Sequence, residues 1–379
     1  MNFDLDSNVR KNESQIQIQK LSRNRRFFNQ LLFLVPLSQY MATFKDNFQI
    51  LRHLTFARLA NLVLLRFSYR ISRILKRSIV WGKPFTVSIE PTTACNLGCS
   101  ECPSGLKNFT RPTGKLDLEL NRQLIQQLGK QLFYINYYFQ GEPFLHPQFL
   151  DLIKDAKKQH IYTATSTNAH FITPQKATEI VASGLDRLII SIDGLTQKTY
   201  ESYRVHGTLS KVIEGAKLLV EAKKAANSAT PHLIFQFLVV KPNEHEIDGV
   251  FDLAKTLEID EVRLKSAQVY DYQNGHELIP ENEKYARYKR QKDGTYRLKY
   301  KTGNHCWRMW SSCVLTWDAQ VVPCCFDKDA KYVLGSAVTE NFDQLWKSKK
   351  YNDFRLAVLT KRNQIDICQN CSEGTKVWV

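Results

Sequence analysis

The chain has 379 residues, of which 43% are apolar and 11% aromatic, so it can bury a hydrophobic core and is not a disordered chain. Its formal net charge is +16. No uninterrupted apolar stretch reaches the roughly 18 residues that a membrane-spanning helix needs, which excludes an integral membrane protein.

The nine cysteines admit either disulfides or metal-bound thiolates. Asp4 and Asp6 open the chain, and the apolar patch near residues 31–37 is interrupted by Pro36 and lacks a small-residue cleavage site, so we recognise no secretory signal. We therefore expect a cytoplasmic protein whose reduced cysteines bind metal.

Residues 1–80 form a basic helical extension, with 14 Lys/Arg against 4 Asp/Glu. Four arginines recur on one stripe of a predicted helix, and four apolar residues fall on another face. Such a helix can lie on an anionic membrane surface, which would give peripheral membrane contact, or pack its apolar face on the main domain. We favour packing. The two sets are Arg66, Arg70, Arg73, Arg77 and Leu64, Phe67, Ile71, Ile74.

Residues 81–267 alternate short β-rich runs with amphipathic segments of helical period, which predicts repeated βα units around a parallel sheet. The predicted strands are 85–90, 134–140, 161–167, 187–193, 233–240 and 261–265. The predicted helices are 117–130, 147–159, 174–183, 211–226 and 244–257. A complete barrel needs eight units, so we expect an α/β fold built on a partial (β/α)6 TIM-like barrel that is open on one side.

Residues 268–303 break this alternation and interleave cations with tyrosines. They could bind a polyanion or an acidic peptide, but we favour a solvated linker or hairpin and do not expect nucleic-acid binding. Residues 304–379 hold six cysteines around a short predicted hairpin and two short helices, at 342–347 and 351–359. We predict a separate small module there.

Cys95, Cys99 and Cys102 follow the first predicted strand within eight residues. A structural zinc site is one interpretation, but zinc needs a fourth ligand, and no cysteine or histidine follows within the next forty residues. Three thiolates suit a cubane iron–sulfur cluster in which one iron has no protein ligand. A small chelating molecule could bind that open iron.

Polar groups also follow the next three predicted strands, at residues 139–143, 165–168 and 190–194. In a βα barrel, reacting groups gather where the strands end. Gly141 lets a ligand approach the backbone, and Glu142 can accept hydrogen bonds from a cationic amine. Asn168 or Ser191 could instead cap a helix. Together these groups predict one elongated polar ligand beside the cysteines.

The Cys-x3-Cys-x2-Cys spacing and the following Gly-Glu-Pro resemble the radical S-adenosylmethionine (SAM) enzymes over about residues 85–265. The resemblance implies a [4Fe–4S] cluster whose fourth iron is chelated by exchangeable SAM. The family's Gly-Gly-Glu-Pro motif binds the methionine amine, Ser191 would contact the ribose, and Arg204 would reach the ribose or carboxylate. The first glycine of that motif is glutamine here, and Glu101 receives no role. The implied cofactor-binding residues are Gln140, Gly141, Glu142, Pro143, Asn168, Ser191 and Arg204.

The C-terminal cysteines supply four further thiolates, enough to close a second cluster or a zinc ribbon. Their arrangement resembles the SPASM and twitch extensions of radical SAM enzymes, which begin Cys-x(9–15)-Gly-x4-Cys, with Ala319 in place of the glycine here. The resemblance implies one auxiliary [4Fe–4S] cluster. Its implied ligands are Cys306, Cys324, Cys368 and Cys371.

Cys313 and Cys325 are left over. Neighbouring side chains of an extended strand face opposite ways, so Cys325 turns away from the cluster, toward a substrate, if Cys324 faces it. In the related sulfatase-maturing enzymes a catalytic aspartate stands at the position of Cys325, and Asp327 is close by. Either residue is a candidate proton acceptor, and a buried free cysteine is the alternative.

The resemblance implies an electron donor such as flavodoxin or ferredoxin, cleavage of SAM to methionine and a 5′-deoxyadenosyl radical, and hydrogen abstraction from a substrate. An auxiliary cluster that accepts a second electron favours a two-electron oxidation or the modification of a peptide or protein. Modification of a small metabolite, sugar or lipid-linked substrate is the alternative. The rival class is a non-catalytic iron–sulfur or zinc protein that binds a partner or carries electrons.

Overall fold

The computed structural model describes residues 40–300 and 302–373. The chain divides into two compact units, residues 1–48 and 49–379. The first unit is described only over residues 40–48, the beginning of helix α2 (Tyr40–Arg52). The predictions for residues 1–39 therefore lie outside the described part of the chain.

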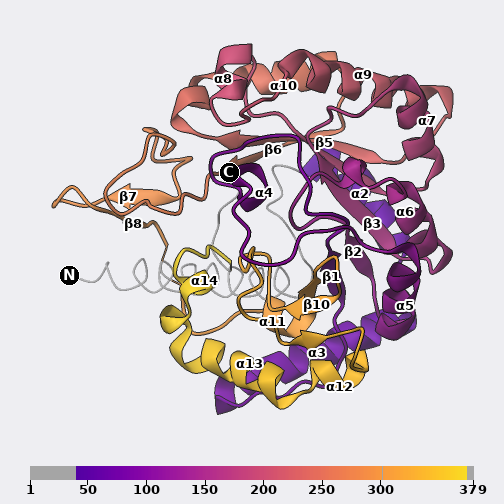
Figure 1. Cartoon of the computed structure of the whole chain (residues 1–379), viewed down its shortest axis with the longest axis vertical. Coiled ribbons are helices and arrows are strands. Elements are labelled where there is room, and N and C mark those ends of the chain that lie inside the picture. Colours follow the sequence, from indigo (N-terminus) through magenta and orange to yellow (C-terminus); the bar gives the residue numbers. More distant parts are fainter. Residues whose placement is uncertain (1–39, 301, 374–379) are drawn as a thin grey trace, which may run out of the picture. The chain divides into compact units, whose positions relative to one another are not determined.

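In the second unit, nine strands of the described residues form one sheet in the order β11-β10-β9-β1-β2-β3-β4-β5-β6. The strands from β1 to β6 pair in parallel, and helices cover their outer side (Figure 1). These strands are β1 (Thr86–Ile89), β2 (Tyr134–Asn136), β3 (Tyr162–Thr167), β4 (Arg187–Ser191), β5 (His232–Val239) and β6 (Glu261–Ser266). The covering helices are α5 (Leu118–Leu128), α6 (Phe149–Lys158), α7 (Pro174–Ala182), α9 (Leu209–Ala225) and α10 (Ile247–Thr256). The predicted partial (β/α)6 barrel is confirmed.

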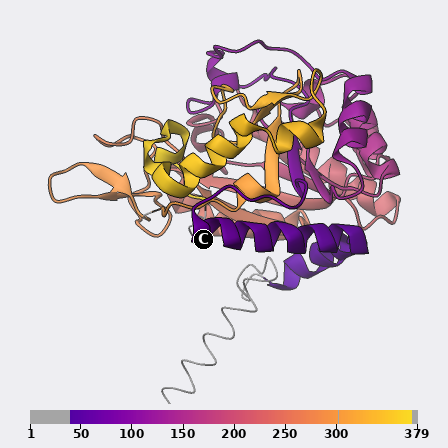
Figure 2. The ribbon, with the colours of Figure 1, turned by 90° about the horizontal axis from the view of Figure 1, so that it is seen from below.

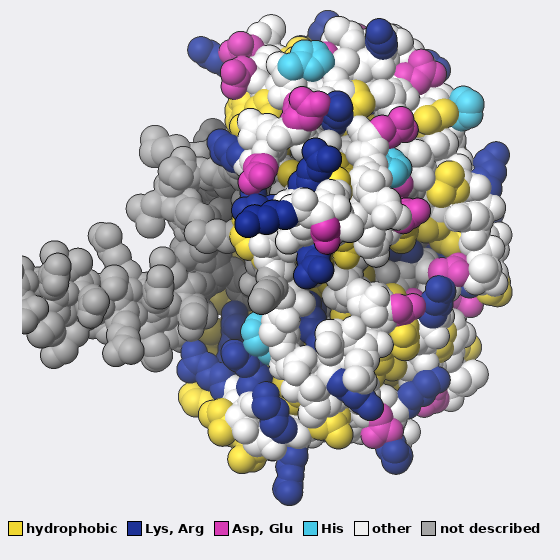
Figure 3. All heavy atoms as spheres, turned by 90° about the vertical axis from the view of Figure 1, so that its left-hand side faces the viewer, with side chains coloured by type: hydrophobic (Ala, Val, Ile, Leu, Met, Phe, Trp, Pro, Cys, Tyr) yellow, Lys and Arg dark blue, Asp and Glu magenta, His cyan; other side chains and the backbone are white. Residues whose placement is uncertain are grey.

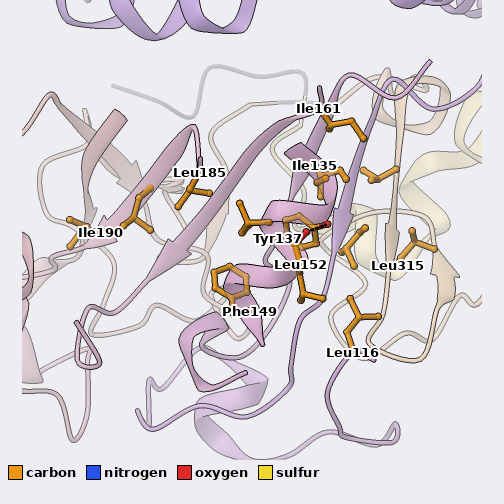
Figure 4. Close-up of a cluster of buried hydrophobic side chains, with 14 of the residues drawn as sticks. Leu116, Ile135, Tyr137, Phe149, Leu152, Ile161, Leu185, Ile190 and Leu315 are labelled. Carbon is orange, nitrogen blue, oxygen red and sulfur yellow. Dashed lines mark hydrogen bonds between the residues drawn. The ribbon is translucent and has the colours of Figure 1, made fainter. Parts of the chain in front are cut away.

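The core lies between the sheet and these helices because alternate strand residues face outward. Ile135 of β2 and Ile190 of β4 are fully buried, and they lie with Phe149 and Leu152 of α6 in one apolar cluster (Figure 4). Burying each such side chain stabilises the fold by about 1.5–3 kcal/mol. The intervening residues are only partly buried, so the opposite face of the sheet lines the interior of the open barrel. They include Ser88, Asn136, Ser166, Gln236 and Lys265.

The C-terminal hairpin continues the barrel sheet. Strand β9 (Ser312–Leu315) pairs in parallel with β1, from Thr86 opposite Ser312 to Ile89 opposite Leu315. β10 (Gln320–Val322) returns antiparallel to β9 and pairs with β11 (Gly335–Ser336). Ala319 takes φ 58° at the hairpin turn, the left-handed conformation that favours glycine. The C-terminal segment thus shares a sheet with the barrel. The sequence predicted a separate module, because pairing between strands that are far apart in the chain leaves no local signal.

The remaining elements surround this sheet. Residues 288–298 form the expected hairpin, which extends away from the barrel (Figure 1). Its strands are β7 (Tyr288–Arg290) and β8 (Tyr296–Leu298), and the short barrel elements are α4 (Pro103–Leu106), η2 (Pro143–Leu145), α8 (Gln197–Glu201) and η3 (Lys241–Glu246). The C-terminal helices are α11 (Arg308–Ser311), α12 (Phe342–Trp346), α13 (Lys349–Lys361), η4 (Arg362–Gln364) and α14 (Asp366–Gln369).

Helix α3 (Phe56–Leu75) runs along one side of the second unit (Figure 2) and packs on it through a largely polar face. Its buried residues are Arg58, Asn61, Leu65, Ser68, Tyr69 and Ser72. The Arg58 guanidinium donates to the His160 and Gln159 carbonyls beyond α6, and the Asn61 side chain donates to the Lys83 carbonyl at 3.0 Å. The expectation that α3 packs through its apolar face is wrong, because Arg58 and Asn61 face the protein and donate to backbone carbonyls there. Leu64, Phe67 and Ile74 are exposed.

Candidate active site

The three N-terminal cysteines lie in a tight loop between β1 and α4. The Cys102 amide donates to the Cys99 carbonyl at 3.2 Å, and Cys102 is the N-cap residue of α4. Gly105 of α4 approaches the loop so closely that a Cβ there would lie 2.5 Å from the Cys99 nitrogen. The loop therefore holds Cys95, Cys99 and Cys102 on a short, fixed piece of backbone.

Burial raises the pKa of the Cys95 thiol to about 12 and also raises the pKa of Cys99. A thiolate is therefore unfavourable at either position without a positive charge beside it. Metal ions supply such charge and bind thiols in their deprotonated form. The donor set and its surroundings thus fit a metal cluster, and an unpaired thiolate would be costly there.

The Gly-Glu-Pro segment packs directly against this loop. Gly141 has φ +75°, and a Cβ there would lie 2.2 Å from the Thr92 carbonyl oxygen, so only glycine fits. The Glu142 amide donates to the Ala94 carbonyl at 2.8 Å, which places the motif beside Cys95. Pro143 begins η2, and the Gln140 amide group donates to the Phe139 carbonyl at 2.9 Å. The Cys102 thiol lies 3.7 Å from Gln140 Oε1.

Glu142 is buried and held by the end of the next strand. Its carboxylate accepts hydrogen bonds from the Thr167 hydroxyl and the Asn168 amide, both at 2.8 Å. Burial nevertheless raises the pKa of Glu142 to about 7. The Asn168 side chain donates to Asn96 Oδ1 at 2.8 Å and so ties β3 to the cysteine loop. The predicted residues Glu142 and Asn168 are therefore brought together with the cysteines.

Arg204 also reaches the cysteine loop. Its Nη1 lies 3.7 Å from Cys99 Sγ, and its Nε forms an ion pair with Asp193 Oδ2 at 2.5 Å. Asp193 is fully buried and also accepts a hydrogen bond from the Leu238 amide at 2.7 Å. Ser191, the last residue of β4, is buried two residues earlier. The sequence analysis gave Asp193 no role, although an acidic residue directly after a buried strand was the available signal.

The four C-terminal cysteines converge on one cavity with an empty volume of about 340 Å³. Cys306, Cys324, Cys368 and Cys371 all line it, from three separate stretches of the C-terminal segment. Burial raises the pKa of Cys306 to about 12 and of Cys368 to about 11. Across residues 40–300 and 302–373, no three His, Cys, Asp or Glu side chains meet at a site for a single metal ion.

Cations surround this cavity. Arg362 is almost fully buried and donates to the His305 carbonyl at 2.6 Å and to Cys371 Sγ at 3.4 Å. Arg308 forms an ion pair with Glu373 at 2.6 Å. Positive charge beside several thiolates lowers the free energy of a buried anionic centre.

Comparison with known proteins assigns the family. Residues 89–254 match the family model of the radical SAM superfamily, and residues 306–372 match that of the SPASM iron–sulfur cluster-binding domain. The chain belongs to the radical SAM superfamily. As a radical SAM enzyme with a SPASM domain, it uses a [4Fe–4S] cluster with SAM and an auxiliary iron–sulfur cluster.

Several characterised proteins resemble this radical SAM enzyme. It is 26% identical over 313 residues to the tungsten-containing aldehyde ferredoxin oxidoreductase cofactor-modifying protein of Pyrococcus furiosus, covering 75% of this chain and 86% of the relative. It is 32% identical over 140 residues to mycofactocin maturase MftC of Mycobacterium tuberculosis, covering 37% and 35%. The structure of Streptococcus suis SuiB bound to precursor peptide SuiA matches with a TM-score of 0.57 and 14% identity, covering 78% and 72%. That last match shows a shared fold.

The two candidate proton acceptors of this radical SAM enzyme have different surroundings. Asp327 is buried, and its two carboxylate oxygens accept hydrogen bonds from the Lys331 and Tyr332 amides at 2.8 and 2.9 Å, so it shapes its own loop. Cys325 is only partly buried, and Arg308 Nη1 lies 3.9 Å from its Sγ. Cys313 is buried in the core through β9.

A group of cations that the sequence analysis missed lies at the end of β6. The pKa of Lys265 is lowered, chiefly by burial. The positive charges of Arg287, Lys328 and Arg308 lower it further, whereas Cys325 raises it. These groups are thus close enough to interact. Arg287 is buried, and its Nε has no hydrogen-bond partner among the described residues. No motif marks the set, because its members come from four separate segments.

Of the helices in the described part of the chain, none is long and apolar enough to cross a membrane.

Proposed function

We propose that Cys95, Cys99 and Cys102 hold the [4Fe–4S] cluster and leave one iron open to SAM. The observation that carries this proposal is the packing of Glu142, Asn168 and Arg204 against the same cysteine loop. Gln140, Gly141, Pro143 and Ser191 complete the proposed SAM site. A protein that only carried electrons would not need these groups.

We further propose that Cys306, Cys324, Cys368 and Cys371 hold the auxiliary cluster, supported by the cavity that they share. When bound, the two clusters supply the electron that cleaves SAM and an acceptor for a second electron. The chain's own residues hold these groups, orient SAM through Glu142 and neutralise buried charge through Arg362. A two-electron oxidation of the substrate is the reaction that this pair of sites favours.

The substrate is proposed to lie in the open barrel, near Cys325 and Lys265, and to carry an anionic group. The cations near the end of β6 support this, because Lys265, Arg287, Lys328 and Arg308 gather positive charge there that would attract an anionic group. The relatives are named for the modification of cofactors and the maturation of mycofactocin, which supports a peptide or cofactor precursor over a free sugar. A flavodoxin or ferredoxin is the proposed electron donor.

The test is anaerobic reconstitution with iron and sulfide, followed by dithionite and SAM, with 5′-deoxyadenosine as the readout. We expect about eight irons per chain and cleavage that Cys99→Ala abolishes, while Cys313→Ala, the matched buried cysteine, leaves it intact. Stoichiometric zinc without cleavage would refute the proposal.

The substrate class is tested separately. Acidic peptides are compared with their amide counterparts, in which Asp and Glu become Asn and Gln, for stimulation of SAM cleavage. Stimulation by the acidic set alone, lost in Lys265→Gln, supports an anionic substrate, and equal effects of both sets reject it. Full product formation by Cys325→Ala would remove Cys325 from the chemistry, and Asp327→Asn tests the other candidate in the same assay.

A further inference from the structure

The orientation of α3 is the reverse of what an amphipathic helix on a protein surface normally adopts. Such a helix buries its apolar stripe and exposes its polar face. Here four of the six buried residues are polar, and the buried face carries Arg58, Asn61, Ser68 and Ser72 together with Leu65 and Tyr69. The apolar stripe points outward, and its members, spaced at i, i+3, i+7, i+11 and i+18, are Phe56, Leu59, Val63, Phe67 and Ile74.

This stripe is long and well exposed. Phe56, Phe67 and Ile74 expose 88%, 54% and 79% of their surface. Eighteen residues separate its ends, which corresponds to about 27 Å along the helix. An exposed apolar stripe of this length marks a surface that another body covers.

Positive charges flank the stripe on one side. Arg70, Arg73 and Arg77 are exposed, and the sequence holds no acidic residue between Asn47 and Ile89. Figure 3 shows basic and hydrophobic side chains side by side at its lower left. An apolar stripe with an arginine flank matches a bilayer interface, where acyl chains meet anionic headgroups.

We propose that the outward face of α3 docks in the plane of an anionic lipid bilayer, with the apolar stripe among the acyl chains and the arginines at the phosphates. The polar buried face supports this arrangement, because its hydrogen bonds hold the helix on the protein while the stripe enters the lipid. A second copy of the chain would cover the same stripe, and the experiment below distinguishes it from a bilayer.

The test is sedimentation of the full chain with phosphatidylcholine vesicles that contain about one third phosphatidylglycerol or none. We expect binding to the anionic vesicles only, weakened by high salt. Phe67→Ser with Ile74→Ser should weaken it at least tenfold, and Arg70→Gln with Arg73→Gln roughly tenfold or more. The matched controls, Phe251→Ser on α10 and Lys349→Gln on α13, are exposed elsewhere and should change nothing.

Absence of vesicle binding, or binding unchanged in the Phe67→Ser and Ile74→Ser double variant, overturns the proposal. Light scattering is the second readout. A dimer that this double variant converts to a monomer would assign the stripe to a second copy instead. The readouts need neither SAM nor a substrate, so they are independent of the proposed function.

Discussion

At the scale of single residues, the proposed SAM site depends on a few buried polar groups that hold one another in place. Glu142 is the central one, since it accepts hydrogen bonds at the end of β3 and lies beside the cysteine loop. Its three hydrogen-bond donors, the Thr167 hydroxyl and the Asn168 and Phe144 amides, fix the carboxylate, yet burial still raises its pKa. A cationic ligand is therefore the group that this carboxylate lacks.

The raised pKa predicts a pH dependence of SAM binding. Glu142 titrates near pH 7 in the unliganded protein instead of near 4.5, so its carboxylate is protonated as the pH falls below 7. The methionine amine needs the ionised form. We expect the affinity to fall by up to about tenfold per pH unit below 7 and to level off above it.

Anaerobic calorimetry of the reconstituted enzyme between pH 6 and 8 measures this dependence. Glu142→Gln should bind SAM more weakly and lose the pH dependence. An identical slope in that variant would assign the titration to another group.

Asp193 is predicted to act through Arg204. In Asp193→Asn the buried guanidinium loses its charged partner, so we expect SAM binding to weaken about tenfold or more while the fold persists. Equilibrium binding together with thermal unfolding measures both effects. Loss of stability without any change in affinity would reduce Asp193 to a structural role.

The sequence predicted many residues of this site but not those that hold them in position through hydrogen bonds and ion pairs. Cys95, Gly141 and Glu142 sit in short motifs, so their spacing alone marks them. Asp193 and Thr167 lie in the polar strand ends 190–194 and 165–168, but their partners Arg204 and Glu142 come from other segments, which no local pattern identifies. Lys265 was missed for the same reason, since its cationic neighbours come from other segments.

At the scale of elements, α3 shows how far amphipathic pattern can mislead. The pattern located the helix and its two faces correctly, but it assigned the buried face by hydrophobicity. The interaction that decides which face is buried is the pair of hydrogen bonds that Arg58 donates to the Gln159 and His160 carbonyls. The strands and helices of the barrel, by contrast, bury the faces that their apolar periodicity predicts, because the surfaces against which they pack are also apolar.

Removing this donor should therefore destabilise the protein although Arg58 belongs to a basic helix. We expect Arg58→Met to lower the free energy of unfolding by about 2–4 kcal/mol, because the buried Arg58 loses its hydrogen bonds to the Gln159 and His160 carbonyls. Chemical denaturation measures it. Arg77→Met, at an exposed arginine of the same segment, should change it by about 0.5 kcal/mol or less, and equal effects of the two changes would contradict this account.

At the scale of the whole molecule, two sets of cysteines are joined by one sheet. The proposed SAM cluster follows β1, and β1 pairs with β9 of the C-terminal segment. A second link joins the segment after β1 to the segment after β9. The buried Glu90 accepts a hydrogen bond from the Trp317 amide at 3.3 Å and is held in place by a bidentate ion pair with Arg111. The sequence predicted both sets of cysteines but not their connection.

The two sites should be separable by mutation. Cys324→Ala is expected to lower the iron content from about eight to about four per chain and to leave SAM cleavage to 5′-deoxyadenosine measurable, while oxidation of the substrate fails. Iron analysis and product chromatography check this. Loss of cleavage in Cys324→Ala, or no loss of iron, would contradict two independent sites.

The parallel pairing of β1 with β9 also has a consequence for synthesis of the protein. Roughly 220 residues separate the two strands, so the ribosome needs roughly 10–45 s to deliver β9 after β1. During that interval one edge of β1 has open amide and carbonyl groups, and such an edge invites pairing with other chains. A nascent chain of this protein is thus most vulnerable to aggregation before its last fifth is translated, and chains that stop short of β9 should depend on chaperones to stay soluble.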